Sequence, residues 1–216
     1  MSYKRSLALG FVLALAAFAV AAWLYPSLPD PVPSHWNAAG EADDYMAKPW
    51  GAFITPLFML GTWIVLAALP KISPRGYRLD QFIGVYGIVT LAILVTILIV
   101  VIVTLLAAAG AQLDLTRIVF IVVGGLFVVL GNYMGKMRKN FFVGIRTPWT
   151  LASDEVWVRT HRLGGWLFVL AGFAIIVVGI LKLAPWAFMA AIGGAALIPA
   201  IYSYFAYRQV EQRRSQ

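Results

Sequence analysis

The chain has 216 residues, 62% of them hydrophobic and 12% charged, whereas soluble domains carry about 25% charged residues, so the composition indicates a polytopic membrane protein. The absence of cysteine excludes disulfides, thiolate metal sites and cysteine nucleophiles. The net charge of +8 does not indicate direct nucleic-acid binding, because the basic residues stand in short segments beside apolar runs, where they set membrane orientation.

Six segments reach the length of about 20 apolar residues that a membrane-spanning helix needs. They are Leu7–Tyr25, Trp50–Leu69, Phe82–Ala109, Thr116–Met134, Leu163–Leu183 and Pro185–Tyr207. The pattern predicts an all-α fold, a bundle of six transmembrane helices. Prolines predict the helix ends, because proline lacks the N–H that a helix interior needs. They are Pro26, Pro29, Pro31 and Pro33 after the first span, Pro70 and Pro74 after the second, and Pro185 between the last two.

Lysine and arginine are unequally divided between the two sides of the predicted bundle. One side has 14 of them and the other has 3. The larger group is Lys4, Arg5, Lys71, Arg75, Arg78, Lys136, Arg138, Lys139, Arg146, Arg159, Arg162, Arg208, Arg213 and Arg214, and the smaller is Lys48, Arg117 and Lys182. Because basic connections stay in the cytoplasm, both termini are predicted to be cytoplasmic.

This topology divides the chain into three parts. Residues 1–69 form a two-helix unit with an extracytoplasmic proline-rich loop at 26–49, and residues 70–134 form the third and fourth spans. Residues 135–216 comprise a cytoplasmic loop at 135–162 and a two-helix hairpin. The lipid bilayer is the one partner that this organisation requires.

The extracytoplasmic loop is predicted to be shaped rather than slack, because prolines stiffen its start and turn-forming residues follow. A calcium site is not expected, since the EF-hand spacing is absent. His35 and His161 are the only histidines and fall on opposite sides of the bilayer, so they cannot share a metal or a catalytic site. We therefore expect no metal, cofactor or catalytic group, and interpret the loop as a candidate surface for a ligand or toxic peptide. Its candidate residues are His35, Trp36, Asn37, Gly40, Glu41 and Lys48.

The spans themselves hold few polar groups. No ionisable side chain lies well inside them, which disfavours a proton-coupled carrier. Small residues recur every four positions at Gly131 and Gly135, and at Ala187, Ala191 and Ala195. This spacing lets helix backbones approach closely, and we interpret it as packing within the bundle rather than a dimer seam. The oligomeric state is not predicted.

The segment from Asn140 to Arg162 is too specific in composition for a simple membrane linker. Pro148 interrupts it, and Ser153 is placed to cap a new helix with acidic residues in its first turn. Trp157, His161 and Gly164 then share one helical face, which predicts an amphipathic helix at the membrane surface or one running into the fifth span. The alternative is that its arginines contact lipid phosphates while Trp149 and Trp157 lie in the headgroup zone.

These residues resemble the signature of the SdpI family. The matching positions are Asn132, Gly135, Asn140, Gly144, Ile145, Arg146, Thr147, Pro148, Trp149, Thr150, Trp157, Thr160, His161 and Arg162. The amino-terminal pattern resembles the domain of unknown function that commonly accompanies this family. It consists of Leu28, Pro29, Asp30, His35, Trp36, Asn37, Gly40, Glu41, Lys48, Pro49 and Pro56.

The resemblance implies a protein of the bacterial cytoplasmic membrane. In the founding member it implies immunity to a secreted killing toxin, together with toxin sensing coupled to membrane sequestration of a repressor. By this resemblance the candidate partner-binding residues of the cytoplasmic side are Asn132, Gly135, Asn140, Gly144, Arg146, Thr147, Pro148, Trp149, Trp157, His161 and Arg162.

Two functions are therefore compatible with the sequence. The first is an immunity and signalling protein that engages a toxic peptide outside and a repressor inside. The second is a small-solute or lipid-interacting permease, which would need a continuous polar path of the kind that Asn132 and the intramembrane threonines could begin. An intramembrane enzyme would need a polar catalytic pair at one depth, and the spans contain none.

Overall fold

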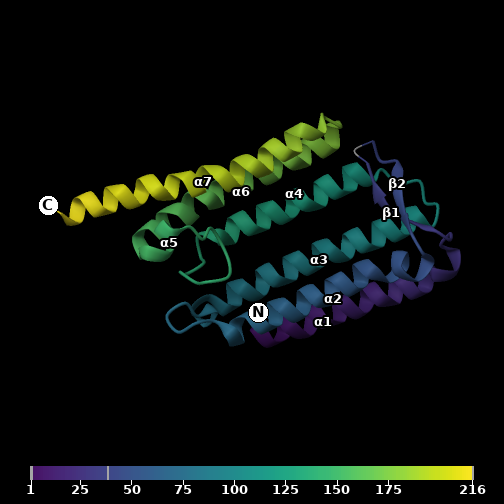
Figure 1. Cartoon of the computed structure of the whole chain (residues 1–216), viewed down its shortest axis with the longest axis horizontal. Coiled ribbons are helices and arrows are strands. Elements are labelled where there is room, and N and C mark those ends of the chain that lie inside the picture. Colours follow the sequence, from purple (N-terminus) through teal and green to yellow (C-terminus); the bar gives the residue numbers. More distant parts are fainter. Residues whose placement is uncertain (1, 38, 216) are drawn as a thin grey trace.

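The computed structural model describes residues 2–37 and 39–215 as a bundle of long helices with a small β-hairpin at one end (Figure 1). The long helices are α1 (Tyr3–Leu24), α2 (Lys48–Ile72), α3 (Ile83–Ala108), α4 (Leu115–Met134), α6 (Asp154–Leu181) and α7 (Pro185–Arg214). The short elements are η1 (Tyr25–Ser27), β1 (Val32–Trp36), β2 (Ala42–Met46), η2 (Leu79–Phe82) and α5 (Pro148–Ala152). Within the described residues, six helices are long and apolar enough to cross a membrane, which confirms the predicted bundle.

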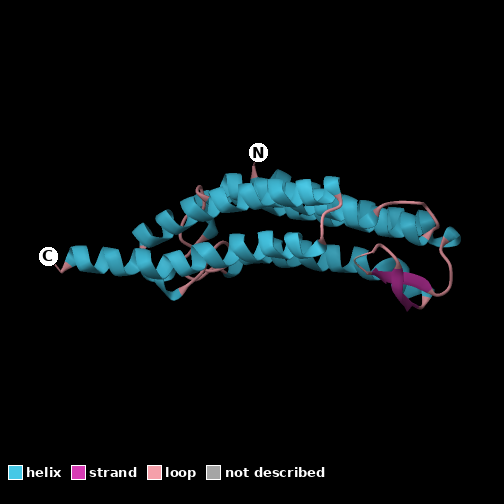
Figure 2. Ribbon diagram, turned by 90° about the horizontal axis from the view of Figure 1, so that it is seen from above, coloured by secondary structure: helices cyan, strands magenta, loops and turns pink. Residues whose placement is uncertain are grey.

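The two ends of the bundle differ in character. We call the end that carries β1 and β2 the hairpin end, and the end that carries residues 135–153 the loop end. Both chain termini lie toward the loop end, and the long helices run along one common axis between the two ends (Figures 1 and 2). The positive-inside rule predicts that the loop end is cytoplasmic.

The helices pack in two groups of three. α1, α2 and α3 contact one another, α6 contacts both α4 and α7, and α3 also contacts α4. The first group is built on a face of small residues, Ala14, Ala17 and Ala21, all completely buried. Ala17 and Ala21 pack in one cluster with the buried Leu94 and Val101 of α3. The side chains that point away from these contacts remain large, apolar and exposed, as lipid-facing side chains must be.

α4 and α6 approach each other along a seam of glycines, which we call the glycine seam. A Cβ atom on Gly124 would lie 2.7 Å from the carbonyl oxygen of Gly172, and one on Gly131 would lie 2.6 Å from that of Gly165. Conversely, a Cβ on Gly172 would lie 2.6 Å from the carbonyl oxygen of Gly124, and one on Gly165 would lie 2.8 Å from that of Gly131. Glycine is required at these four positions because any side chain would separate the helices. The prediction of packing within the bundle is thus confirmed for Gly131 but is wrong for Gly135, where a Cβ would meet nothing within 4 Å.

The predicted end of the second span at Pro70 is wrong, because α2 continues to Ile72. Pro70 cannot donate a hydrogen bond to the carbonyl of Leu66, four residues earlier, so this carbonyl loses its intrahelical donor. The hydroxyl of Tyr86 on α3 donates to the Leu66 oxygen at 2.6 Å and replaces the missing bond. A helix continues past a proline where a neighbouring helix supplies such a donor.

The all-α prediction omits one element of the described chain, the two-stranded antiparallel sheet of β1 and β2. Its register pairs Val32 with Met46 and Trp36 with Ala42, with irregular spacing around His35. Val32 is completely buried and packs on Gly51 of α2, where a Cβ would lie 2.6 Å from the Val32 Cβ. The hairpin is therefore seated on the helix that follows it, and the loop is shaped as predicted.

Candidate functional site

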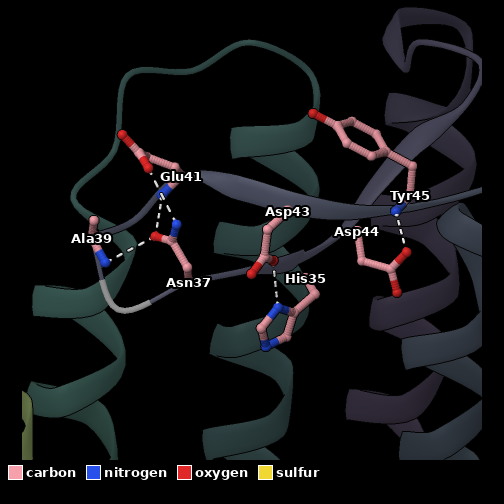
Figure 3. A network of polar contacts seen from close by, with 7 residues as sticks. All are labelled: His35, Asn37, Ala39, Glu41, Asp43, Asp44 and Tyr45. Atoms are coloured by element: carbon pink, nitrogen blue, oxygen red, sulfur yellow. Dashed lines mark hydrogen bonds and ion pairs between the residues drawn. The ribbon is translucent and has the colours of Figure 1, made fainter.

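The tip of the hairpin is held by the side chain of Asn37 (Figure 3). Its Oδ1 accepts hydrogen bonds from the backbone N–H groups of Ala39 at 2.9 Å and Glu41 at 3.1 Å, and its Nδ2 donates to the Glu41 carboxylate at 3.2 Å. Gly40 has φ +82°, a left-handed conformation that glycine adopts without strain. Asn37, Gly40 and Glu41, all predicted ligand-binding residues, thus build the turn itself.

His35 and Asp43 face each other across the two strands (Figure 3). The His35 Nδ1 lies 2.5 Å from the Asp43 carboxylate, and both side chains are exposed to a large extent. An exposed pair of this kind contributes little stability, about 0–1 kcal/mol. Its effect is to orient the imidazole at the surface of the hairpin, where a ligand can reach it.

A groove of about 480 Å³ lies between the hairpin and the helices beneath it. Its apolar walls come from α3, α4 and α7, and its polar edge comes from β1 and the residue after it. The polar residues at this edge are Ser34, His35, Trp36 and Asn37, and the apolar lining includes Val100, Val119, Phe120, Phe188 and Met189. The Ser34 hydroxyl has no hydrogen-bond partner within the described chain. The groove combines an apolar floor with unused polar groups, the usual composition of a ligand site.

Lys48 lies outside this groove. Its backbone N–H donates to the Asp30 carboxylate at 3.3 Å, and its Nζ stands 5.1 Å from the centre of the Tyr25 ring. It therefore ties the start of α2 to the end of α1. Of the six residues predicted for the hairpin end, His35, Trp36 and Asn37 line the groove.

At the loop end, Asn140 organises the segment that follows α4. It is completely buried, and its amide makes four hydrogen bonds to the surrounding backbone. The nitrogen donates to the carbonyls of Arg138 at 3.0 Å and Val143 at 2.9 Å. The oxygen accepts from the N–H groups of Phe142 at 2.9 Å and Val143 at 2.7 Å. Every polar atom of the side chain is used, so this asparagine shapes the loop from within.

His161 fastens the loop to α6. Its Nδ1 faces the Trp157 carbonyl at 2.9 Å and must donate to it, while its Nε2 accepts from the Ile145 N–H at 3.0 Å. Because each nitrogen has a fixed role, the buried ring is neutral and in one tautomer. Gly144 lies directly against this ring with φ +105°, so it allows both the turn and the close contact.

Trp157 is stacked on His161, with ring centres 3.9 Å apart, and it is only 1% exposed. Its Nε1 donates to the Met137 carbonyl at 2.8 Å. The interpretation that Trp157 is a headgroup anchor is therefore wrong. The shared helical face of Trp157, His161 and Gly164 instead meets the loop and α4, and α6 continues directly into the fifth span.

The short helix α5 begins with a capping box. Thr147 accepts from the N–H of Thr150 at 3.2 Å, and the Thr150 hydroxyl accepts from the N–H of Thr147 at 2.9 Å. Pro148 occupies the first helical position, where no N–H is needed. The Thr147 hydroxyl also meets the Ser203 hydroxyl of α7 at 2.8 Å. Ser203 donates to the Ala200 carbonyl, so Thr147 is the donor to Ser203.

Trp149 packs edge-to-face on Tyr204 of α7, with ring centres 5.2 Å apart. It belongs to a small core in which the buried Val156 meets Ala206 and Val210. α7 has 30 residues and is about 45 Å long at 1.5 Å per residue, which exceeds a hydrocarbon layer of about 30 Å. This small core lies near the carboxy-terminal end of α7, where the excess length is expected to leave the membrane.

Arg146 differs from its neighbours because its side chain is exposed. Its Nη1 donates to the Phe141 carbonyl at 2.9 Å, and the rest of the guanidinium is available to a partner. Phe141 is 47% exposed, and Arg138 is exposed as well. Arg138, Phe141 and Arg146 are exposed side chains of this loop, and we call these three residues the loop surface.

Asn132, Gly135 and Arg162 lie apart from this loop. All three line a separate pocket where α4 meets α6. Three residues that shape the site were not among the sequence candidates, namely Met137, Thr150 and Ser203. Met137 and Ser203 act through contacts between distant segments, whereas Thr150, three residues after Thr147, fits a capping pattern and was recognisable.

Comparisons with known proteins agree with this organisation. Residues 136–203 match the model of the SdpI/YfhL protein family, and residues 12–60 match a domain of unknown function, DUF1648. The chain is 27% identical over 169 residues to the immunity protein SdpI of Bacillus subtilis strain 168, covering 78% of this chain and 79% of that protein. No solved structure matches the chain. The predicted resemblance to the family, with its amino-terminal domain, is confirmed.

Proposed function

We propose that this SdpI-family membrane protein protects a bacterial host from a secreted toxic peptide. Its similarity is to a protein named for immunity and not to an enzyme family. In this proposal the protein resides in the cytoplasmic membrane with its hairpin end outward, as the distribution of lysine and arginine predicts.

The observation that carries the proposal is the groove of about 480 Å³ beneath the hairpin. A secreted peptide would arrive at this end. Phe120 and Phe188, stacked with ring centres 4.3 Å apart, offer an apolar floor for its hydrophobic side chains. Ser34 and His35 offer hydrogen bonds for its backbone at the rim. The groove opens between the two groups of helices, so a bound peptide would touch both.

A survival assay tests this role. The protein is expressed in a Bacillus subtilis strain that lacks the related immunity protein and is challenged with the toxin to which that loss makes the strain sensitive. Survival well above the empty vector is expected. Survival equal to the empty vector, with the protein present in the membrane, would reject immunity toward this toxin.

A matched pair of substitutions tests the groove. Met189→Trp adds bulk to the groove lining, whereas Met46→Trp adds the same bulk to an exposed hairpin position outside it. The first is expected to lower protection at least tenfold, and the second to leave it within about twofold. Equal protection by both variants at equal membrane levels would remove the groove from the proposal.

The inward half of the proposed function is recruitment of a transcriptional repressor to the loop surface. Arg146 is exposed and can reach a partner, whereas Trp149 is held against Tyr204 and serves as a structural anchor. Recruitment of a fluorescently labelled candidate repressor to the membrane is expected to fall in Arg146→Ala while membrane levels remain normal. Undiminished recruitment in that variant would reject the role of the loop surface.

The permease alternative draws little support from the bundle. Thr62 and Thr104 donate to carbonyls of their own helices, at 2.9 Å to Phe58 and 2.7 Å to Val100. Asn132 is exposed at the side of α4. Polar groups that are satisfied within a helix do not form a path through the bundle. The permease stays a prediction that solute uptake into vesicles containing the protein would test.

A further inference from the structure

A pocket of about 260 Å³ lies beside the glycine seam, close to the loop end of α4 and α6. It is remote from the groove at the hairpin end. Its lining combines two cations, an amide, an indole and bare backbone. The residues are Gly131, Asn132, Gly135, Lys136, Arg162, Gly165, Trp166 and Val169.

The pocket is positively charged without compensation. Lys136 and Arg162 form no ion pair with any acidic residue of the described chain, and no lining residue is acidic. Of the nearby cations, Lys139 pairs with Asp154 at 2.6 Å and Arg159 with Glu155 at 2.6 Å, whereas Arg138 and Arg146 of the loop surface line no part of this pocket. The Lys136 Nζ lies 4.6 Å from the centre of the Tyr133 ring, a contact that leaves its charge uncompensated. The two cations therefore favour a ligand that brings negative charge.

The depth of the pocket matches the headgroup layer of a membrane. α4 ends at Met134 and Lys136 follows directly, while Arg162 precedes the apolar part of α6. Gly131 meets Gly165 at the floor, so both cations lie on the loop-end side of that contact. Trp166 is 68% exposed beside them, as an indole at a membrane–water interface is.

The shape of the pocket suits a lipid as well. Gly135 has open space around it, since a Cβ there would meet nothing within 4 Å. The glycine backbone leaves room for a glycerol ester, and the exposed Asn132 amide can donate to an ester carbonyl. Below this level, Val169 continues the pocket as an apolar surface on which an acyl chain can lie.

We propose that this pocket binds the phosphate of an anionic membrane phospholipid. The Arg162 guanidinium offers a planar pair of donors to the phosphate oxygens, and Lys136 adds a point charge. Trp166 and the glycine floor hold the glycerol region. The sequence left open that the arginines of residues 140–162 contact lipid phosphates. Our proposal assigns this contact to Arg162, whereas Arg159 forms an ion pair with Glu155.

The test measures lipid binding by the full-length protein, purified and delipidated in a neutral detergent. Native mass spectrometry and thermal unfolding are followed while dioleoylphosphatidylglycerol, dioleoylphosphatidylcholine or inorganic phosphate is added at equal concentration. Phosphatidylglycerol is expected to bind at least tenfold more tightly than phosphatidylcholine. Equal stabilisation by inorganic phosphate would overturn the assignment to a lipid, because a free anion would then account for the binding.

Two variants of different chemistry test the pocket. Lys136→Gln combined with Arg162→Gln removes the charge, and Gly135→Leu fills the open space while it keeps the charge. Each is expected to weaken phosphatidylglycerol binding about tenfold. The control, Lys71→Gln with Arg75→Gln, removes two exposed cations near the same end and is expected to bind within about twofold of the wild type. Wild-type affinity in both pocket variants would overturn the proposal, and so would an equal loss in the control.

Discussion

Replacing Asn140 by aspartate tests whether one buried amide holds the loop in shape. The substitution keeps the size and the accepting oxygen but removes the donor to the carbonyls of Arg138 and Val143, which it meets at 3.0 and 2.9 Å. Each buried carbonyl that loses its partner costs about 1–3 kcal/mol. Two such losses predict a destabilisation of about 2–6 kcal/mol, and the carboxylate that replaces the amide adds a desolvation cost because the site is completely buried.

The assay combines thermal unfolding in detergent with trypsin cleavage after Arg146 in membranes that expose the loop end. At roughly 2–4 °C per kcal/mol for a chain of this size, the midpoint is expected to fall by at least about 4 °C, with faster cleavage at Arg146. Gln81→Glu makes the same chemical change in an exposed side chain near the loop and is expected to alter neither measurement. A midpoint and cleavage rate for Asn140→Asp that match this control would refute the reasoning.

Two further predictions concern the bundle. Tyr86→Phe leaves the Leu66 carbonyl without its hydrogen-bond donor. The free energy of unfolding in detergent should therefore fall by about 0.6–1.5 kcal/mol. An unchanged midpoint of thermal unfolding would show that this hydrogen bond contributes nothing. Gly124→Ala should destabilise by about 1–3 kcal/mol because its Cβ meets the Gly172 oxygen at 2.7 Å, whereas the adjacent Gly125→Ala has open space and should be neutral or slightly stabilising. Similar thermal midpoints for the two alanine variants would contradict the glycine seam.

The spans were predictable because the bilayer sets their length and composition. Most of their ends move by a few residues, but α6 begins nine residues before the predicted Leu163 and α7 ends seven residues after the predicted Tyr207. The capping role of Ser153 was equally local, and its hydroxyl does accept the hydrogen bond from the Val156 N–H. The end of the second span was wrongly predicted at Pro70, because the helix tolerates this proline through a hydrogen bond from Tyr86, which lies on another helix. A rule that considers only the local helix cannot see a donor supplied across the bundle.

The candidate site was predictable as a set of positions but not as a set of roles. Trp157 and His161 were correctly placed on one helical face, but the same spacing would arise whether that face contacted lipid, solvent or protein. Only the position of residues 137–145 decides that this face is buried. For the same reason, Asn140 and Arg146 looked equivalent in the sequence, although one is completely enclosed and the other exposed.

The glycine seam restricts how the carboxy-terminal half of the bundle can move. At Gly124, Gly131, Gly165 and Gly172 its contacts join backbone to backbone, so at these positions no side chain can rearrange to absorb a tilt or a rotation. Separating the helices would open a void in close-packed structure, whereas sliding them along their axes keeps the surfaces together. We therefore expect any motion between α4 and α6 to be a shear along the glycine seam rather than an opening of it.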